Sequence, residues 1–322
     1  LALSLHAAET LVSPDGAVKA LFDLRDGQPV CSLSYKEAAI LEPAPLGVNL
    51  KDAFRGGFAV VETARGSVKA EWKPVWGERA TIPDAYNGLT VTLKEKDPRG
   101  QPLVLELRAY NEGLALRYRL PFAAGTAWQI ESESTEFRFP QGSAAFAIKW
   151  TEDTFPQDPI PLADLPKNAM APFTVRLPDG KYAAVLEAFV VHYPRCMIEK
   201  REAGAVGIHL QGRAEGRGEF TTPWRAVLVA DNEARLVERE YFVQNLNPPC
   251  AIADTSWIKP GLTVSDHYNC MLKMPDLKKV IDVACTNGFR YLQLDWGWYG
   301  TEWPWTDADR KKFLEVNPSW AA

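Results

Sequence analysis

Short runs of strand-forming residues, separated by turn dipeptides, fill most of the chain from Ser13 onward. Each dipeptide ends in glycine and has apolar or alternating runs on both sides. The dipeptides are Asp15-Gly16, Asp26-Gly27, Asn87-Gly88, Arg99-Gly100 and Asp179-Gly180. Many short strands at such spacing are typical of antiparallel sandwiches and argue against a parallel sheet. The sequence therefore predicts a mainly β fold.

The clearest hairpin runs from Leu103 to Leu120. Its arms, 103–110 and 114–120, flank the turn Asn111-Glu112-Gly113. The second arm alternates apolar residues with arginine, which places one face in a core and the other in solvent or against a neighbour.

A proline-rich segment and a polar connector break the strand pattern. Five prolines lie between Pro156 and Pro172, which excludes a central strand and predicts a long surface loop. A short helix is predicted near 233–242, and the rigid connector 245–249 follows it. We therefore expect a β-sandwich domain over residues 9–247, with a linker and a second domain over 248–322.

The pattern changes in the stretch 254–299, where a helix and then a strand are predicted. One apolar helix face is formed by Leu277, Val280, Ile281 and Ala284. The run 289–294 reads as a strand that ends at a cluster of polar and aromatic residues. This order is typical of the opening of an α/β barrel, in which the carboxyl ends of the strands hold the active site.

Four residues of this stretch are candidate substrate contacts. Asp295 and Trp298 follow the strand, and Trp257 and Lys259 precede the helix. A carboxylate, an ammonium group and two indoles suit a pocket with a few convergent polar groups. The alternative is that these aromatic residues only pack against the barrel.

The composition and net charge argue against two classes of partner, nucleic acids and membranes. The chain has 322 residues, 46% of them hydrophobic, and its net charge of −5 arises from 36 basic and 41 acidic residues without long blocks of either sign. We therefore expect neither a nucleic-acid nor a membrane partner, and a monomer or weak oligomer. Eleven tryptophans and ten tyrosines suit stacking on sugar rings, although a large β core would also use them.

The five cysteines lie at wide, irregular spacing without a C-x-x-C pair, so neither zinc nor thiol redox chemistry is indicated. We expect buried free thiols at Cys31, Cys196, Cys250, Cys270 and Cys285.

The first eight residues form a short apolar tract that ends in two alanines. Residues 1–8 are interpreted as the remnant of a secretory signal peptide, which predicts a periplasmic or secreted protein. An ordinary apolar first strand is the alternative.

Glu187 is a single carboxylate inside a strongly apolar run, 181–191. A buried glutamate is unfavourable unless a cation pairs with it, and a hard cation such as calcium favours carboxylate oxygens. From the residues alone, two alternatives to calcium stay open: the side chain faces solvent, or it pairs with an arginine.

The chain resembles glycoside hydrolase family 97, a family of exported bacterial α-glucosidases and α-galactosidases. The resemblance is spread over nearly the whole chain rather than confined to one motif. It is carried by Pro45-Leu46-Gly47, Val75-Trp76-Gly77-Glu78, Tyr86-Asn87, Asn111-Glu112-Gly113, Arg117-Tyr118, Thr222-Pro223-Trp224-Arg225 and the run 254–261.

The resemblance implies a galactose-mutarotase-like β super-sandwich, then a (β/α)8 catalytic barrel and a C-terminal β domain. From Ala251 to Ala322 the chain has 72 residues, whereas a barrel needs about 250. We therefore expect a truncated barrel of which only the first strands and helix are present. The implied partner is an α-linked oligosaccharide.

The resemblance also implies a calcium ligand. In calcium-dependent members the N-terminal domain contributes a glutamate within an E-A-x-x-x-x-Y-P pattern, and here Glu187-Ala188 and Tyr193-Pro194 match it. Calcium is therefore the implied cofactor, with Glu187 as one ligand. His192 stands where the family usually has aspartate.

Catalysis requires two carboxyl groups astride the scissile bond. In the family these residues lie in later barrel strands, so we expect none within this chain and place them after Ala322. The resemblance thus predicts an exo-acting α-glycosidase represented by an inactive fragment. A non-catalytic carbohydrate-binding or scaffolding sandwich is the alternative.

Overall fold

The computed structural model describes residues 7–96, 100–148, 158–265 and 274–294, with single positions at 308, 311 and 315. The chain divides into two compact units. The first comprises Leu1–Pro74 and Arg79–Cys250, and the second comprises Val75–Glu78 and Ala251–Ala322. The hairpin tip at 75–78 thus belongs to a different unit from the strands that lead to it.

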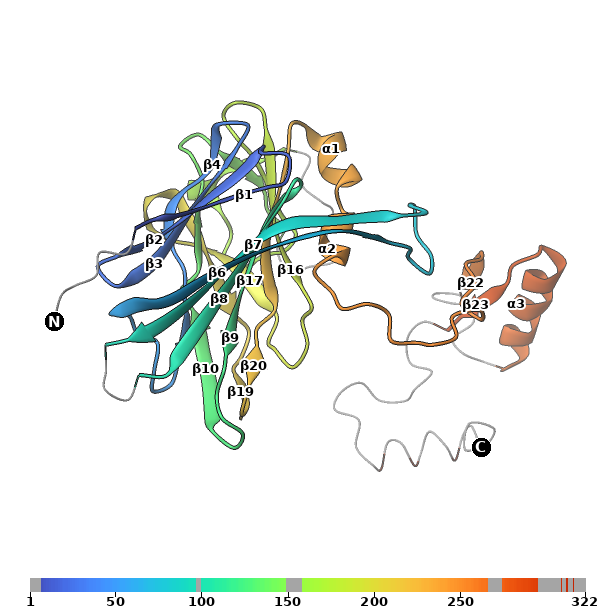
Figure 1. Ribbon diagram of the computed structural model, residues 1–322. Coiled ribbons are helices and arrows are strands. Elements are labelled where there is room, and N and C mark those ends of the chain that lie inside the picture. Colours follow the sequence, from blue (N-terminus) through green and yellow to red (C-terminus); the bar gives the residue numbers. More distant parts are fainter. Residues whose placement is uncertain are drawn as a thin grey trace. The chain divides into compact units, whose positions relative to one another are not determined.

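Two large antiparallel sheets dominate the first unit (Figure 1). Over the described residues, one sheet has eight strands and the other has ten. The eight-stranded sheet consists, in spatial order, of β1 (Glu9–Val12), β2 (Val18–Arg25), β3 (Gln28–Tyr35), β4 (Ala38–Pro45), β11 (Glu136–Arg138), β18 (Ala205–Leu210), β17 (Cys196–Lys200) and β14 (Ala169–Met170).

The ten-stranded sheet consists, in spatial order, of β13 (Ile160–Pro161), β12 (Ala144–Phe146), β15 (Phe173–Arg176), β16 (Tyr182–Ala188), β21 (Trp224–Ala230), β9 (Gly113–Leu120), β8 (Pro102–Tyr110), β7 (Ile82–Glu95) and β6 (Phe58–Trp72), with β20 (Phe220–Thr221) paired to β9. A third, three-stranded sheet contains β19 (Ala214–Arg217), β10 (Ala127–Glu133) and β5 (Val48–Leu50).

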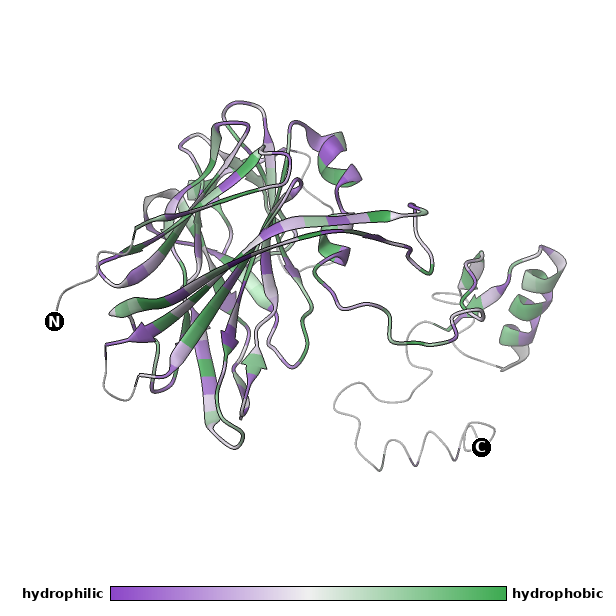
Figure 2. Ribbon diagram, in the orientation of Figure 1, coloured by the Kyte–Doolittle hydropathy of each residue, from purple (hydrophilic) through white to green (hydrophobic). Residues whose placement is uncertain are grey.

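The main core lies between the sheets. Leu33 and Ile198 of the eight-stranded sheet share one buried apolar cluster with Leu105 and Val227 of the ten-stranded sheet. Period-two alternation along the strands explains this, because every second side chain points to the same face. Figure 2 shows hydrophobic and hydrophilic residues along single strands. The predictions of a mainly β fold and of an N-terminal super-sandwich are confirmed.

The predicted hairpin is present as β8 and β9, with Val104 opposite Arg119 and Tyr110 opposite Gly113. The proline-rich segment, described from residue 158, contains β13, β14 and the 3₁₀ turn Leu162–Asp164. The two short strands lie at the ends of their sheets, where a residue without an N–H is tolerated.

The outer face of the ten-stranded sheet carries a second, smaller core. The predicted helix near 233–242 is two helices, α1 (Glu233–Glu238) and α2 (Tyr241–Gln244). Asn232 begins α1, where its side chain accepts a hydrogen bond from the N–H of Arg235 at 3.0 Å. Phe242 of α2 packs edge-on against Tyr110, with ring centroids 5.2 Å apart.

Trp224 lies on the same outer face, yet it is fully buried. The guanidinium groups of Arg108 and Arg117 lie 4.6 and 4.2 Å from the indole ring. Cations attract the face of an aromatic ring, so these two side chains cover the indole in place of an apolar layer. The alternating arginines of the hairpin thus face a neighbour rather than water alone.

In the second unit, β22 (Thr263–Ser265) and β23 (Tyr291–Gln293) pair in parallel, and α3 (Met274–Thr286) connects them in sequence. A strand, a helix and a parallel strand form the repeating unit of α/β barrels, although a barrel itself stays a prediction. Of the predicted helix face, Leu277 and Ala284 are buried whereas Ile281 is 43% exposed. Figure 2 shows apolar and polar residues around α3. Within the described ranges, no helix is both long and apolar enough to cross a bilayer.

The cysteine prediction is half right. Cys31 and Cys196 are buried free thiols, whereas Cys250, just after the connector, and Cys285, in α3, are exposed. Cys270 lies outside the described residues.

Candidate functional site

Glu187 and Arg225 form a cross-strand ion pair at the end of β16. They are direct partners in the antiparallel pairing of β16 with β21, so both side chains point to the same face of the sheet. Nη1 of Arg225 donates to Oε2 of Glu187 at 2.8 Å. The structure therefore places an arginine beside Glu187, which is one of the two alternatives that the sequence left open.

Arg225 also binds Glu133, which lies at the end of β10. Its Nη2 and Nε donate to the two carboxylate oxygens of Glu133 at 2.5 and 3.1 Å. Both side chains are only 1% exposed. A buried charge is tolerated when a bidentate partner satisfies it, and here the guanidinium reaches two carboxylates.

Tyr193 closes the cluster from another side. Its hydroxyl donates to Oε1 of Glu133 at 2.9 Å, and its ring lies 5.7 Å from the guanidinium of Arg225. Burial, together with the nearby negative charge of Glu133, raises the pKa of Tyr193 well above its ordinary value. Tyr193 therefore stays neutral and acts as a hydrogen-bond donor. His192, just before it, is exposed and has a φ of 51°.

The cluster carries an excess negative charge. Burial acts to lower the pKa of Arg225, but Glu133 and the other neighbouring groups together outweigh burial and raise the pKa well above its ordinary value, so the guanidinium stays charged. Burial raises the pKa of the neighbouring Cys196, so that thiol is neutral. In the contacts described for this cluster, the guanidinium of Arg225 faces the two carboxylates of Glu133 and Glu187.

Glu187 is the more accessible of the two carboxylates, with 19% of its side chain exposed. Arg225 binds only Oε2 in the contacts above, and an additional cation would balance the excess charge. Among the described residues, however, no group of three or more His, Cys, Asp or Glu side chains is arranged to hold a metal ion. Calcium takes six to eight oxygen ligands, so Glu187 fits as one ligand and not as a complete site.

Trp257 and Lys259 lie in an exposed turn of the second unit. The side chain of Asp254 accepts a hydrogen bond from the N–H of Ser256 at 2.9 Å, which begins this turn and lowers the pKa of Asp254. Trp257 is 67% exposed. The carbonyl of Lys259 accepts a hydrogen bond from the hydroxyl of Tyr291, the first residue of β23.

Trp76 also belongs to the second unit and lies close to this turn. Its indole N–H donates to the carbonyl of Ile258, the residue between Trp257 and Lys259. This contact gives a structural role to the Val75-Trp76-Gly77-Glu78 motif. The other two predicted substrate contacts, Asp295 and Trp298, lie outside the described residues.

Sequence reasoning did not find Glu133 or the role of Arg225. In the sequence Arg225 stands out only as the last residue of a family motif, and Glu133 lies in an unremarkable run of alternating Glu and Ser. No local signal links the two, because they are 92 positions apart in the chain. The pairing of distant strands brings them together.

Residues 11–249 match the family model described as the N-terminal domain of glycosyl hydrolase family 97. A probable retaining alpha-galactosidase of Streptomyces bingchenggensis is 27% identical over 89% of the chain and 46% of its own length. A retaining alpha-galactosidase of Bacteroides thetaiotaomicron is 25% identical over 92% of the chain and 51% of its own length. The chain thus spans about half the length of these curated relatives.

Solved structures agree with this assignment. A family 97 enzyme from Pseudoalteromonas sp. strain K8, in complex with panose, superposes with a TM-score of 0.82 at 25% identity, covering 96% of the chain and 53% of its own. A beta-arabinopyranosidase shares the fold, with a TM-score of 0.80 at 19% identity over 97% of the chain and 54% of its own. Because the family model covers well over half of its length, the chain belongs to glycoside hydrolase family 97.

Proposed function

We propose that the protein containing this chain is an exo-acting α-glycoside hydrolase that removes terminal α-galactosyl groups with retention of configuration. The observation that carries the proposal is the similarity to two retaining alpha-galactosidases over about nine-tenths of the chain. The solved family 97 enzyme in complex with panose supports α-glucosides as the second substrate to test.

The sandwich does not supply the catalytic pair in this proposal. Retention requires two carboxyl groups about 5–5.5 Å apart on either side of the scissile bond, both of them open to substrate. Glu133 is 1% exposed, and both it and Glu187 bind Arg225. Both carboxylates are therefore engaged in ion pairs with Arg225. Trp257 and Lys259, together with Asp295 and Trp298, are proposed as substrate contacts in the second unit.

The test compares two proteins on 4-nitrophenyl α-galactoside and 4-nitrophenyl α-glucoside. The first is the longer natural protein, which contains this chain and has about the length of its relatives. It should release nitrophenol from both substrates, and faster from the galactoside. The 322-residue chain alone should release none above the uncatalysed rate. Hydrolysis by the chain alone would contradict the assignment of catalysis to residues beyond it, and failure of the longer protein on every α-glycoside would refute the hydrolase proposal.

We also propose that Glu187 contributes one oxygen to a calcium ion whose other ligands lie outside the described residues. The excess negative charge of the Glu133–Arg225–Glu187 cluster and the exposed fraction of Glu187 support this. When bound, calcium would supply positive charge next to the sandwich. Arg225 would keep the carboxylate of Glu187 oriented, because its other hydrogen bonds fix it to Glu133.

The calcium proposal predicts a thermal shift that depends on Glu187. In the longer natural protein, calcium should raise the melting temperature, because a ligand that binds only the folded state stabilises it. Glu187→Gln should abolish most of this shift. Glu199→Gln is the matched control, since Glu199 is also 19% exposed and pairs with Arg201 at 3.2 Å. An equal calcium shift in wild type and Glu187→Gln would show that Glu187 is not a ligand.

A further inference from the structure

A pocket of about 730 Å³ opens in the first unit, in the three-stranded sheet. Lys51 lies just after β5, Gln129 is in β10 and Glu215 is in β19, so the pocket draws on all three strands of that sheet. Gln101, just before β8, borders it as well. Its volume is within the range of small-molecule sites, about 300–1,000 Å³.

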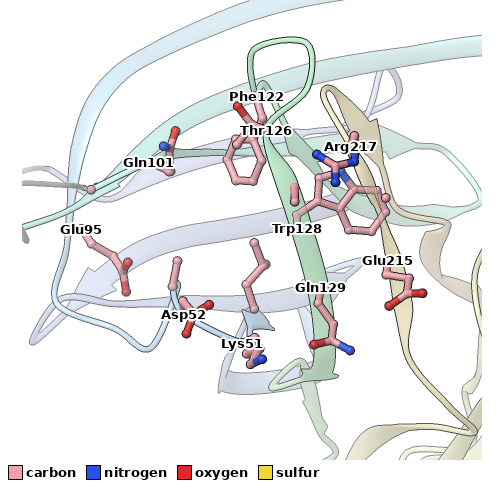
Figure 3. A pocket seen from close by; sticks show the side chains of 15 residues that line it. Lys51, Asp52, Glu95, Gln101, Phe122, Thr126, Trp128, Gln129, Glu215 and Arg217 are labelled. Atoms are coloured by element: carbon pink, nitrogen blue, oxygen red, sulfur yellow. The ribbon is translucent and has the colours of Figure 1, made fainter.

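The apolar part of the pocket is held rigidly by Trp128. Its indole N–H donates to the carbonyl of Gly218 at 3.1 Å, and its ring packs against Phe220 with centroids 4.4 Å apart. A Cβ at Gly216 would lie 2.6 Å from the indole, so the glycine makes room for the ring. Phe122, also buried, completes this wall, which is shown in Figure 3.

Several polar side chains of the pocket have no partner within the part of the chain that the structure describes. Figure 3 shows them around the pocket, and they are Lys51, Asp52, Gln101, Gln129 and Glu215. By contrast, Glu95 accepts a hydrogen bond from the N–H of Arg55 at 2.6 Å, and Arg217 donates to the carbonyl of Gly125 at 3.1 Å. The pocket therefore combines a fixed apolar wall with donors and acceptors that are available to a ligand.

The charges of the lining indicate a neutral ligand. Lys51 and Arg217 face Asp52, Glu95 and Glu215, so positive and negative groups are mixed and nearly balanced. A phosphate or sulfate site would need mostly cations and backbone N–H groups, and a metal site would need converging carboxylates. Alternating carboxylates, amides and one ammonium group instead match hydroxyl groups, each of which both donates and accepts.

We propose that this pocket binds a neutral saccharide, with Asp52 and Gln129 as its main polar contacts and the wall of Phe122 and Trp128 facing the apolar side of a sugar ring. The site lies wholly within the first unit. Through this pocket the sandwich holds carbohydrate without cleaving it. The proposal goes beyond the proposed hydrolysis, because binding here requires no cleavage and no residue of the second unit.

The test is isothermal titration of the 322-residue chain with raffinose and, separately, maltotriose. At least one sugar should bind with a Kd in about the millimolar range or tighter. The double variant Asp52→Ala/Gln129→Ala should weaken that binding at least about tenfold. Its melting temperature should match wild type, because neither side chain has an internal partner in the described structure.

A control variant tests whether the loss of binding is specific to this pocket. The double variant Glu62→Ala/Glu71→Ala removes two exposed side chains of β6 and should bind as wild type does. Absence of binding by the wild-type chain, or undiminished binding by Asp52→Ala/Gln129→Ala, would overturn the proposal. Neither outcome bears on hydrolysis by the longer protein.

Discussion

The charged side chains inside the sandwich differ in whether their buried polar atoms have hydrogen-bond partners. Arg225 and Glu133 are fully buried and joined by two hydrogen bonds. Asp84, in β7, is less favourably placed, because its buried Oδ1 has no hydrogen-bond partner among the described residues. The nearby hydroxyl of Tyr110 is equally unpartnered, and the geometry between the two groups falls short of a hydrogen bond.

We predict that Asp84→Asn stabilises the protein at neutral pH. Burial raises the pKa of Asp84, although Tyr110 and Arg108 oppose part of this effect. A carboxyl whose folded pKa lies above its unfolded value of about 3.9 contributes stability only while protonated, and loses it as pH rises through the folded pKa. The amide avoids this partly buried charge, so Asp84→Asn should unfold at a slightly higher urea concentration at pH 7, and the difference should shrink towards pH 4.

Asp179 is the control, because its pKa is shifted in the opposite direction to that of Asp84. The hydrogen bond from Lys181 lowers the pKa of Asp179, so this carboxylate adds stability above its unfolded pKa and loses it on acidification. Asp179→Asn should therefore destabilise the protein slightly at pH 7 and have no effect at low pH. Parallel pH profiles for the two variants would contradict the roles assigned to both residues.

Glu187 shows what can and what cannot be predicted from the sequence alone. An unusual carboxylate at Glu187 could be identified from the apolar residues around it. Its partner could not, because Arg225 is opposite Glu187 only in the actual register of β16 and β21. A slip of one residue would turn Arg225 to the other face of the sheet.

At the scale of elements, the long local patterns were predictable and the helix boundaries were not. The hairpin of β8 and β9 follows directly from alternation around Asn111-Glu112-Gly113. The helix predicted near 233–242 is divided at residues 239–240, because α2 packs its apolar side chains onto the sheet while α1 is mostly exposed. Local propensity contains no information about that packing.

Gly113 shows why the turn of this hairpin contains glycine. It begins β9 opposite Leu228 of β21, and a Cβ there would lie 2.1 Å from the carbonyl oxygen of Val227. We predict that Gly113→Ala destabilises the protein by about 1–3 kcal/mol, because backbone atoms cannot yield as a side-chain end can. Urea unfolding monitored by circular dichroism would measure the loss.

Gly66 is the matched control for this substitution. It lies within β6, and a Cβ there would meet no atom within 4 Å. Gly66→Ala should be neutral or stabilising by up to about 1 kcal/mol, since alanine loses less backbone entropy on folding. Equal destabilisation by both substitutions would show that close approach to β21 is not the cause at Gly113.

At the scale of the molecule, sheet order could not be derived from local patterns. β4 is followed in its sheet by β11, and β21 pairs with β9, so the sheets join segments about 90 or more positions apart. The super-sandwich was predicted from a resemblance to a family, not from periodicity. The pocket beside the three-stranded sheet was missed for the same reason, since its lining comes from segments that are distant in sequence.

The division of the chain also bears on how such a protein can evolve. Four residues, Val75–Glu78, belong to the second unit although strands of the first unit lie on both sides of them. A single recombination after Cys250 would therefore carry Trp76 away with the sandwich and leave Ile258 behind. A replacement second unit would keep this contact only if it offered a carbonyl acceptor for that indole. The sandwich is thus inherited together with four residues of the second unit. A complete exchange of the second unit would require two further crossovers, one on each side of Val75–Glu78.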